Sequence, residues 1–374
     1  MDTNLYGRPV SISGRMLSWV LAIGLSLISL FLDWQADRFS SWETSLTLPF
    51  WVCAVVTIAL GYWVVPILRA LKAGQYIRED GPQAHLKKAG TPTMGGVFFI
   101  PVAVAISLLW SGFSSAVTPA DLTALLGVSL LTLSYGLIGW LDDWQVLRRQ
   151  SNKGISPRMK LALQIGLGAM FCGWVSFQPY AINLTSIAFP LGFALPLGWL
   201  FWPLAGFVLV AESNATNLTD GVDGLMAGTG SIALLGLGWS VASTSPSLAI
   251  FCACLSGGCL GFLAHNRNPA TVFMGDTGSL ALGGALAAVG IITNNLFVLM
   301  ILSGLFFVET LSVILQVGYY KATKNKDGIG KRLFRMAPLH HHLELSGWSE
   351  LQVVAAFYTI VALLSTIGLG IGGF

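Results

Sequence analysis

Charged residues are scarce in this sequence. Asp, Glu, Lys and Arg make up only 10% of the 374 residues, and 54% are hydrophobic, whereas charged residues make up about 25% of an ordinary soluble domain. The low charge excludes a chain built of soluble domains. Long apolar runs are present instead, of the length that membrane-spanning helices need. The sequence therefore predicts an all-α polytopic membrane protein.

Cysteine is also scarce, and its placement excludes two kinds of site. The five cysteines all fall within apolar segments and form no CxxC pair, which makes disulfides and a zinc site improbable. No internal repeat, low-complexity tail or motif that reads nucleic-acid bases is present. We therefore expect packing roles for Cys53, Cys172, Cys252, Cys254 and Cys259.

The apolar runs predict ten or eleven transmembrane helices. A span needs about 20 mainly apolar residues, and the run near 279–292 is short and close to the next, so a broken helix there would reduce the number to ten. No small-x-small cleavage site follows the first run, so we expect a retained anchor. The eleven runs lie near 16–32, 48–68, 95–111, 122–141, 161–176, 191–212, 225–243, 247–264, 279–292, 296–318 and 351–371.

Basic residues indicate which side of the membrane each connection occupies. With eleven spans, 19 of the 20 lysines and arginines fall on one side, and only Arg38 falls on the other. The richer side is the cytoplasmic one by the positive-inside rule, so the N-terminus is predicted inside and the C-terminus outside. We expect an N-terminal part, 1–46, with an extra span, and a polytopic part, 47–374, whose long polar connections face the cytoplasm.

Two adjacent carboxylates end the fourth run, in "GWLDDW". Asp142 and Asp143 repel each other and lose solvation at the membrane edge, so the arrangement is costly unless a cation or a base offsets it. Mg²⁺ prefers oxygen ligands and usually takes only one or two protein carboxylates, with water and phosphate completing its shell. The pair therefore indicates a magnesium site. A further aspartate, Asp276 in "FMGDTGSLALGG", is equally well explained as a helix cap.

Polar residues recur at every third position in "NATNLTDGVDG". Asn214, Asn217, Asp220 and Asp223 would lie along one side of a helix end or a tight turn, and the glycines leave room for a ligand to approach the backbone. The periodicity alone favours an ordinary polar turn over a binding site.

Two further connections carry groups suited to phosphate. Consecutive residues of a helix point about 100° apart, so the run His340–His342 is a poor metal site, but its imidazoles can donate hydrogen bonds to a diphosphate. The alternative is a basic interfacial loop. Lys88 and Thr93 precede a predicted helix, and helix N-termini attract phosphate, although the segment lacks P-loop spacing.

A single carboxylate, Glu309, interrupts the tenth apolar run. A charge at the bilayer centre costs about 2.5–3.5 kcal/mol on insertion scales, so we expect Glu309 to face the protein interior, paired or protonated. A transporter would use such a residue for ion coupling. The other polar groups crowd the ends of the runs and not their middles, which favours an enzyme at the membrane surface.

Five polar segments, taken in order, resemble the phospho-N-acetylmuramoyl-pentapeptide-transferase family of the polyprenyl-phosphate N-acetylhexosamine-1-phosphate transferase superfamily. The resemblance covers roughly residues 70–374. The segments are "GTPTMGG", "GWLDDW", "NLTDGVDGL", "NPATVFMGDTGSLALGG" and "MAPLHHHLELSGW".

The resemblance implies an enzyme of the bacterial cytoplasmic (inner) membrane. It would transfer phospho-N-acetylmuramoyl-pentapeptide from UDP to undecaprenyl phosphate, giving lipid I and UMP for peptidoglycan biosynthesis, with Mg²⁺ as cofactor and its active site on the cytoplasmic face. The implied partners are UDP-N-acetylmuramoyl-pentapeptide, undecaprenyl phosphate and membrane lipid, with a homodimer as one option and no nucleic acid.

The resemblance also assigns roles to residues. Asp276 matches an aspartate associated with Mg²⁺, and Asp142 and Asp143 match a pair of which one, with Asp142 favoured, deprotonates or orients the lipid phosphate. The metal ligand among the three, and a covalent intermediate, are left open. His341 joins them as a catalytic residue, and Phe273 would stack on uracil. The substrate-binding set is Lys88, Thr93, Lys160, Asn217, Asp220, Asp223, Asn266, Phe273, Gln316, His340 and His342.

Some features depart from the family pattern and keep alternatives open. The family commonly has ten spans, so the run near 16–32 is either an extra span or a helix lying flat on the membrane, and the insertion "KNKDGIGKRL" is long. A sister enzyme that transfers N-acetylglucosamine-1-phosphate would share the aspartates. The segments "TPTMGG" and "MAPLHHHLELSGW" favour the muramoyl-pentapeptide substrate.

Overall fold

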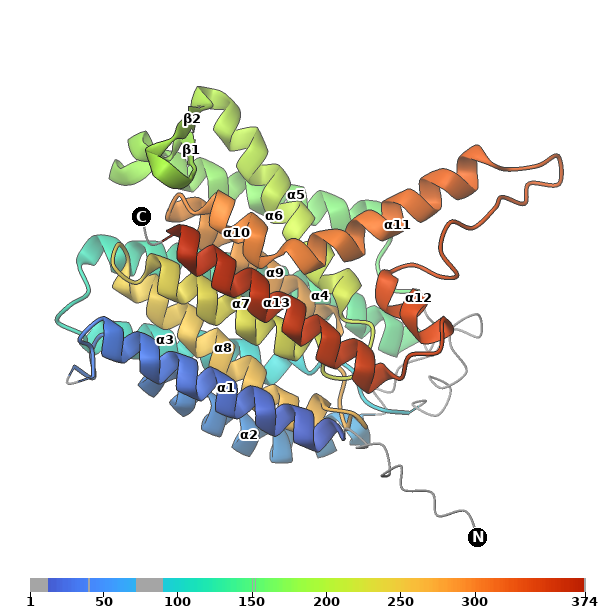
Figure 1. Cartoon of the computed structure of the whole chain (residues 1–374), viewed down its shortest axis with the longest axis horizontal. Helices are drawn as coiled ribbons and strands as arrows, with labels where there is room; N and C mark the ends of the chain where they lie inside the picture. Colours follow the sequence, from blue (N-terminus) through green and yellow to red (C-terminus); the bar gives the residue numbers. More distant parts are fainter. Residues whose placement is uncertain (1–12, 40, 72–89, 150, 152, 373–374) are drawn as a thin grey trace, which may run out of the picture.

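The protein is a bundle of long helices with one small β-hairpin at its side (Figure 1). The computed structural model describes residues 13–39, 41–71, 90–149, 151 and 153–372. The helices are α1 Gly14–Gln35, α2 Thr47–Ala70, α3 Gly96–Phe113, α4 Pro119–Arg149, α5 Pro157–Ser176, α6 Phe201–Thr219, α7 Leu225–Val241, α8 Pro246–Asn266, α9 Gly275–Ile292, α10 Leu296–Leu302, α11 Gly304–Ala322, α12 Leu339–Leu345 and α13 Glu350–Gly372.

The helices confirm an all-α polytopic membrane protein. In the described part of the chain, eight helices are long and apolar enough to cross a membrane, or nine if α10 and α11 together form one span bent by 72°. The sequence predicts ten or eleven spans because it also includes α6 and α7. Both form helices of the bundle, but α7 has only 17 residues and the end of α6 is the polar segment "ESNATNLT".

The structure decides the alternative of a broken helix near 279–292. The helix α9 runs without interruption from Gly275 to Ile292. The break lies in the following apolar run, where Ser303 separates α10 from α11. A short apolar run is therefore no sign of a broken helix when its first turn is polar, as it is in α9.

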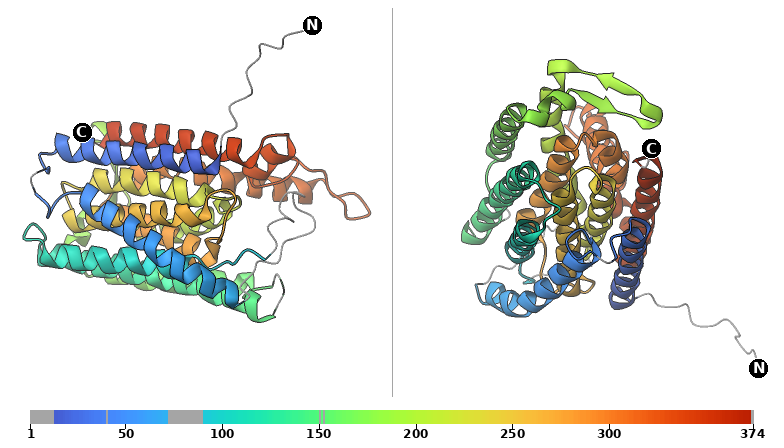
Figure 2. Two further views of the ribbon diagram at one scale, coloured as in Figure 1. Left: turned by 90° about the horizontal axis from the view of Figure 1, so that it is seen from below. Right: turned by 90° about the vertical axis from the view of Figure 1, so that its left-hand side faces the viewer.

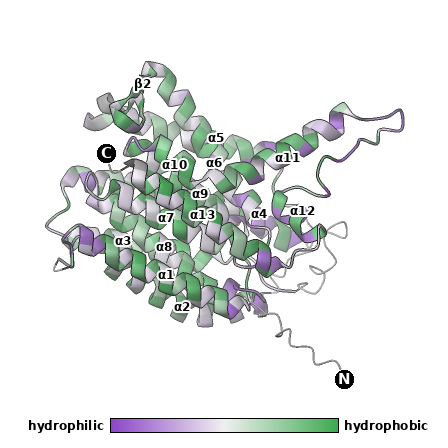
Figure 3. Ribbon diagram, in the orientation of Figure 1, coloured by the Kyte–Doolittle hydropathy of each residue, from purple (hydrophilic) through white to green (hydrophobic). Residues whose placement is uncertain are grey.

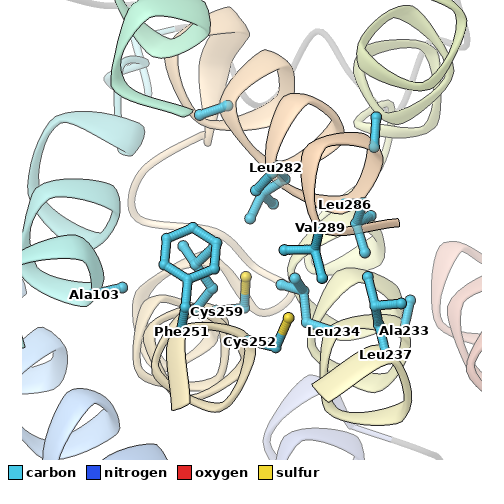
Figure 4. Close-up of a cluster of buried hydrophobic side chains, with 14 of the residues drawn as sticks. Ala103, Ala233, Leu234, Leu237, Phe251, Cys252, Cys259, Leu282, Leu286 and Val289 are labelled. Atoms are coloured by element: carbon cyan, nitrogen blue, oxygen red, sulfur yellow. The ribbon is translucent and has the colours of Figure 1, made fainter. Parts of the chain in front are cut away.

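The core of the bundle is formed by α7, α8 and α9, which other helices surround (Figure 2). Leu234, Phe251 and Leu286, one from each of these helices, are almost completely buried and meet in one cluster (Figure 4). Small residues allow the close contacts: a Cβ on Gly257 of α8 would clash with the backbone of α2 at Phe50. All five cysteines are buried and free, so disulfide bonds among them are absent.

The N-terminal apolar run forms a full-length helix beside the core. The helix α1 has 22 residues and lies alongside α13 and α7 (Figure 2). A buried carboxylate, Asp33, fixes its connection to α2: the side chain accepts hydrogen bonds from Ser45 Oγ at 2.7 Å, Leu46 N at 2.9 Å and Thr47 N at 3.0 Å. This carboxylate satisfies N–H groups that the first turn of a helix leaves without an intrahelical partner.

A small hairpin lies where the sequence predicts the beginning of a membrane span. The apolar run near 191–212 is expected to cross the membrane from its first residue. In the structure, Ser186–Ala188 forms β1 and Ala194–Pro196 forms β2, paired antiparallel with Ile187 opposite Leu195. The apolar residues 191–200 therefore belong to the hairpin and the turn after it, and α6 begins only at Phe201.

Replacing the capping carboxylate should destabilise the protein. Asp33→Ala leaves three buried donors without their acceptor, so we expect the unfolding free energy to fall by about 1–3 kcal/mol. Because the five cysteines are buried, the reaction of a thiol dye during heating of detergent-solubilised protein reports unfolding. Asp37→Asn, at an exposed position nearby, serves as the control. Equal melting temperatures for the two variants would contradict the capping role.

Candidate active site

Carboxylates from three separate segments gather at one end of the bundle. Asp142 and Asp143 lie near the end of α4, Asp276 lies in the first turn of α9, and Asp220 follows the last residue of α6. The backbones of α4 and α9 are in close contact here, since a Cβ on Gly139 would clash with the carbonyl of Asp276. The aspartates that the sequence predicts to act together are thus brought together by helix packing.

Asp143 caps the N-terminus of α9. Its Oδ2 accepts hydrogen bonds from Thr277 Oγ1 at 2.7 Å and Thr277 N at 3.0 Å, and the side chain is buried. A carboxylate in this position satisfies free N–H groups and favours the helix dipole. Gly275, at φ 72°, allows the preceding turn to pass: a Cβ there would clash with Asp143 Oδ2 and Thr93 Oγ1.

Asp142 lies on the open side of the pair and faces Asp276. Its Oδ1 accepts a hydrogen bond from Ile155 N at 2.9 Å, and its carboxyl group interacts with that of Asp276. Two carboxyl groups from different helices are therefore next to each other at the edge of the bundle. Such a pair repels when both groups are ionised, unless a cation lies beside it.

Lys160 supplies that positive charge from the start of α5. Its Nζ forms a salt bridge with Asp276 Oδ2, and Asn217 Nδ2 donates to the other oxygen, Oδ1, at 2.7 Å. Both partners of the salt bridge are partly exposed, Lys160 at 17% and Asp276 at 25%. The carboxylate of Asp276 is therefore fixed in place but remains within reach of solvent and ligands.

Asp220 adds a fourth carboxyl group in a poorly solvated position. Loss of contact with water, followed by repulsion from Asp276, Asp143 and Asp223, raises the pKa of Asp220 to about 8, although a hydrogen bond from the Gly275 backbone opposes the shift. At neutral pH this group is therefore mostly protonated unless a cation approaches.

The carboxylate cluster fits Mg²⁺ better than a metal held by protein alone. Among the described residues, no group of three His, Cys, Asp or Glu side chains converges on one point. Mg²⁺ usually takes only one or two carboxylates and fills its other positions with water and substrate phosphate. Asp142 and Asp276 supply two facing carboxylates, which matches that requirement.

The histidine run divides between two environments. His340 is completely buried, and its Nδ1 lies 2.8 Å from Glu309 Oε2. This contact confirms that Glu309 faces the interior and is paired. The other ring nitrogen, Nε2, has no hydrogen-bond partner among the described residues and lies against Gly221, where a Cβ would clash with it. His340 therefore reaches the turn that carries Asp220.

The other two histidines form hydrogen bonds with residues close to them in the sequence. His341 Nδ1 lies 2.8 Å from Glu344 Oε2, and His342 Nδ1 accepts a hydrogen bond from Arg335 N at 3.1 Å. The catalytic role of His341 and the binding role of His342 stay predictions.

Several predicted substrate-binding residues also support the loops of the site. Asn266 accepts from Gly224 N at 3.0 Å and donates to Val272 O at 2.9 Å, which links two of these loops. Gln316 accepts hydrogen bonds from Leu333 N and Phe334 N and donates to Phe334 O.

The remaining predicted residues are placed as follows. The backbone of Phe273 pairs with the segment around Thr93, through Pro92 O at 2.8 Å and Gly95 N at 2.9 Å. Asp223 is buried and accepts from Ala270 N at 2.9 Å. Lys88 lies outside the described residues. The binding roles of this group stay predictions.

Sequence reasoning misses one buried acid near the site. Glu212 of α6 is completely buried, and its Oε1 accepts a hydrogen bond from Ser303 Oγ at 2.5 Å, at the break between α10 and α11. Glu309 is identified by being a lone carboxylate within an apolar run. Glu212 ends the apolar segment "FVLVAE", so the same signal would have identified it.

Comparisons with known proteins agree with this arrangement. The profile of the family described as "Glycosyl transferase family 4" matches residues 125–294, and the profile "Phospho-N-acetylmuramoyl-pentapeptide-transferase signature 1" matches residues 88–100. Similar curated proteins include one from a Nostoc species, 68% identical over 374 residues, with 99% of each chain covered. Others are from Trichormus variabilis, 68% identical over the full length of both chains, and Gloeothece citriformis, 58% identical over 98% of this chain and 99% of that protein. Each of the three is named phospho-N-acetylmuramoyl-pentapeptide-transferase.

Removing the lysine should make the protein depend on a divalent cation for stability. In Lys160→Met the facing carboxylates lose their positive partner, so we expect the unfolding free energy without Mg²⁺ to fall by about 1–3 kcal/mol. Added MgCl₂ should then raise the melting temperature more in this variant than in the unchanged protein, because a ligand of the folded state stabilises it. Lys153→Met, at an exposed position of the same connection, is the control. An identical response to Mg²⁺ in both variants would show that Lys160 does not offset the cluster.

Proposed function

The chain belongs to the phospho-N-acetylmuramoyl-pentapeptide-transferase family, and from this premise we propose which of its residues carry out the reaction. The chain is a multi-pass membrane transferase of lipid I synthesis. It transfers phospho-N-acetylmuramoyl-pentapeptide from UDP to undecaprenyl phosphate. An oxygen of the lipid phosphate forms a bond to the β-phosphorus of the nucleotide sugar, and the bond from that phosphorus to the oxygen of UMP breaks.

The observation that carries the proposal is the meeting of Asp142, Asp276 and Lys160 at the membrane edge. Phosphoryl transfer requires chiefly that two anionic groups are positioned and their charge neutralised. Mg²⁺, bound by Asp276 and Asp142, would supply the positive charge that lets two phosphates approach each other. Lys160 lies beside the same carboxylate and adds a second positive charge.

The geometry favours Asp142 over Asp143 as the residue that faces the lipid phosphate. Asp143 is buried, and its oxygens already accept hydrogen bonds from the first turn of α9. Asp142 is half-buried and faces Asp276 across the edge of the bundle. We assign Asp142 to orienting or deprotonating the lipid phosphate and Asp143 to positioning α9, and with it Asp276.

An apolar groove beside Lys160 supports a lipid substrate. A cavity of about 860 Å³ lies between α5 and α6, and its walls are almost entirely apolar. It begins at Leu161, the residue after Lys160, and continues along both helices to Trp202. A polyprenyl chain lying in this groove would carry its phosphate to Lys160 and Asp276. Figure 3 shows that α5 and α6 are hydrophobic along most of their lengths.

The nucleotide sugar would approach from the polar side of the cluster. The turn after α6 presents Asp220 and Gly221, and the unpartnered Nε2 of His340 lies against it. An imidazole nitrogen without a partner costs free energy when buried, so a substrate group that binds it would remove that cost. We assign His340 and this turn to the diphosphate side of the substrate, and Phe273 to stacking on the uracil ring.

The distribution of basic residues supports a cytoplasmic active site. Arg69, Arg148 and Lys321 lie in the last turns of their helices, at the end of the bundle that carries the aspartates. At the opposite end, Arg38 lies over the ring of Trp239. The positive-inside rule assigns the more basic end to the cytoplasm. A homodimer stays a prediction.

Loss of either facing carboxylate should abolish turnover. Asp276→Asn and Asp142→Asn keep the size of the side chain but remove the charge, and we expect UMP release to fall at least ~100-fold, as for loss of a group that stabilises transition-state charge. UMP release is measured with detergent-purified protein, Mg²⁺ and both substrates. Asp327→Asn, in an exposed loop, should release UMP at the normal rate. Near-normal turnover of Asp142→Asn would remove that residue from the mechanism.

Metal removal and a change of donor test the reaction separately. With UDP-N-acetylmuramoyl-pentapeptide and undecaprenyl phosphate, chelation by EDTA should stop UMP release and added Mg²⁺ should restore it, because the substrate phosphates need a cation beside the carboxylates. UDP-N-acetylglucosamine should give no UMP. Turnover of the glucosamine donor alone would assign the protein to the sister enzymes, and turnover that survives EDTA would remove the metal from the mechanism.

A further inference from the structure

The connection between α5 and α6 carries no charge. Residues 177–200 contain no Lys, Arg, Asp, Glu or His, although they link two helices at the end of the bundle opposite the aspartates. The α1–α2 connection at the same end contains Asp37, Arg38 and Glu43. A connection exposed to water normally carries polar and charged residues, so an uncharged one of this length requires a physical reason.

The side chains of this connection are apolar and exposed. Leu191 at the tip is 93% exposed, Phe193 61% and Trp199 76%, and Leu195 and Leu200 are exposed as well. Aromatic residues such as Trp favour the interface between membrane and water. This surface is apolar enough that its sequence resembles the start of a membrane span.

The tip has a backbone conformation that a leucine rarely adopts. Leu191 has φ 61° and Gly192 has φ 76°, and residues other than glycine, asparagine and aspartate are strained there. A turn in water would be better served by a small polar residue at the first position. The leucine at this position gives the tip an apolar side chain in spite of the strain, which is favourable only where that side chain leaves water.

The backbone of the hairpin is largely satisfied internally. The two strands pair from Ser186 opposite Pro196 to Ala188 opposite Ala194, Phe189 N donates to Phe193 O at 2.8 Å, and Leu197 N donates to Thr185 O at 2.9 Å. A segment can enter a lipid environment only if its backbone groups have partners of their own. The hairpin meets this condition in its paired part.

Aromatic contacts fix the direction in which the hairpin points. The ring of Phe189 lies 4.9 Å from that of Phe297 in α10 and 5.6 Å from that of Phe193. The two strands lie across the helices, at the side of the bundle (Figure 2). The hairpin is thus held at the side of the helices.

We propose that residues 190–200 form a membrane anchor that inserts the side chains of Leu191, Phe193 and Leu195 into the lipid leaflet on the side opposite the aspartates. The occupant of this surface is the bilayer itself. The paired backbone satisfies the condition for contact with lipid, and the uncharged, apolar, exposed tip with Trp199 beside it is suited to the membrane interface. This inference does not depend on the proposed reaction.

The test measures the depth of the tip with a fluorescent probe. Because all five native cysteines are buried, Leu191→Cys gives one accessible thiol, which is labelled with an environment-sensitive dye in the full-length protein reconstituted into phosphatidylethanolamine–phosphatidylglycerol vesicles. The unchanged protein should take up no dye. Ala116→Cys, in an exposed turn at the same end of the bundle, is the matched control. Its neighbour Ser115 donates a hydrogen bond to the carboxylate of Glu43, and a charged group there indicates that this turn lies in water.

The proposal predicts opposite quenching at the two positions. Nitroxide groups on lipid acyl chains should quench the dye at position 191 about twofold or more strongly than the dye at 116, and aqueous iodide should quench the dye at 116 more strongly. Leu195→Cys gives an independent reading from the second strand. If iodide quenches the dyes at 191 and 195 as strongly as the dye at 116, the hairpin lies in water and the proposal is wrong.

Discussion

The site depends on the contact between the end of α4 and the beginning of α9. Hydrogen bonds from Thr277 to Asp143 fix the first turn of α9, and Gly139 lets the two backbones approach each other. This contact places Asp276 opposite Asp142. One carboxylate of the adjacent pair therefore holds a helix end, and the other faces Asp276. The pairing of two adjacent aspartates is explained by this division of roles.

Charge at the membrane edge is expensive, and the fold offsets it with nearby groups. Asp276 is bound by Lys160 and Asn217, and Glu309, deeper in the bundle, is bound by His340. Within the part of the chain that the structure describes, no basic side chain forms a salt bridge with Asp220, and its pKa is raised to about 8. The cluster therefore favours the approach of a further cation, which is the requirement of a reaction between two phosphates.

The two ends of the bundle differ in charge and polarity. The end with the aspartates carries most of the basic residues and the polar loops, where a lipid phosphate and a nucleotide sugar would meet. The other end includes an uncharged hairpin whose tip, at Leu191, is exposed and apolar. The apolar groove between α5 and α6 extends from Leu161, beside Lys160, toward the hairpin end of these helices.

Hydropathy and the spacing of polar residues were enough to predict most of the helices and the aspartates that come together at one end of the bundle. Apolar runs specify membrane helices because every unpaired backbone group is costly in lipid, and a lone Glu309 within such a run had to be paired for the same reason. The sequence alone did not show that Asp143 holds the first turn of α9, that Asn266 and Gln316 support the loops, or that residues 191–200 belong to a hairpin and the turn after it instead of a membrane span. These points required the folded structure, because hydropathy records whether a residue prefers water or lipid, whereas the partner of each polar atom is set by segments far away in the chain.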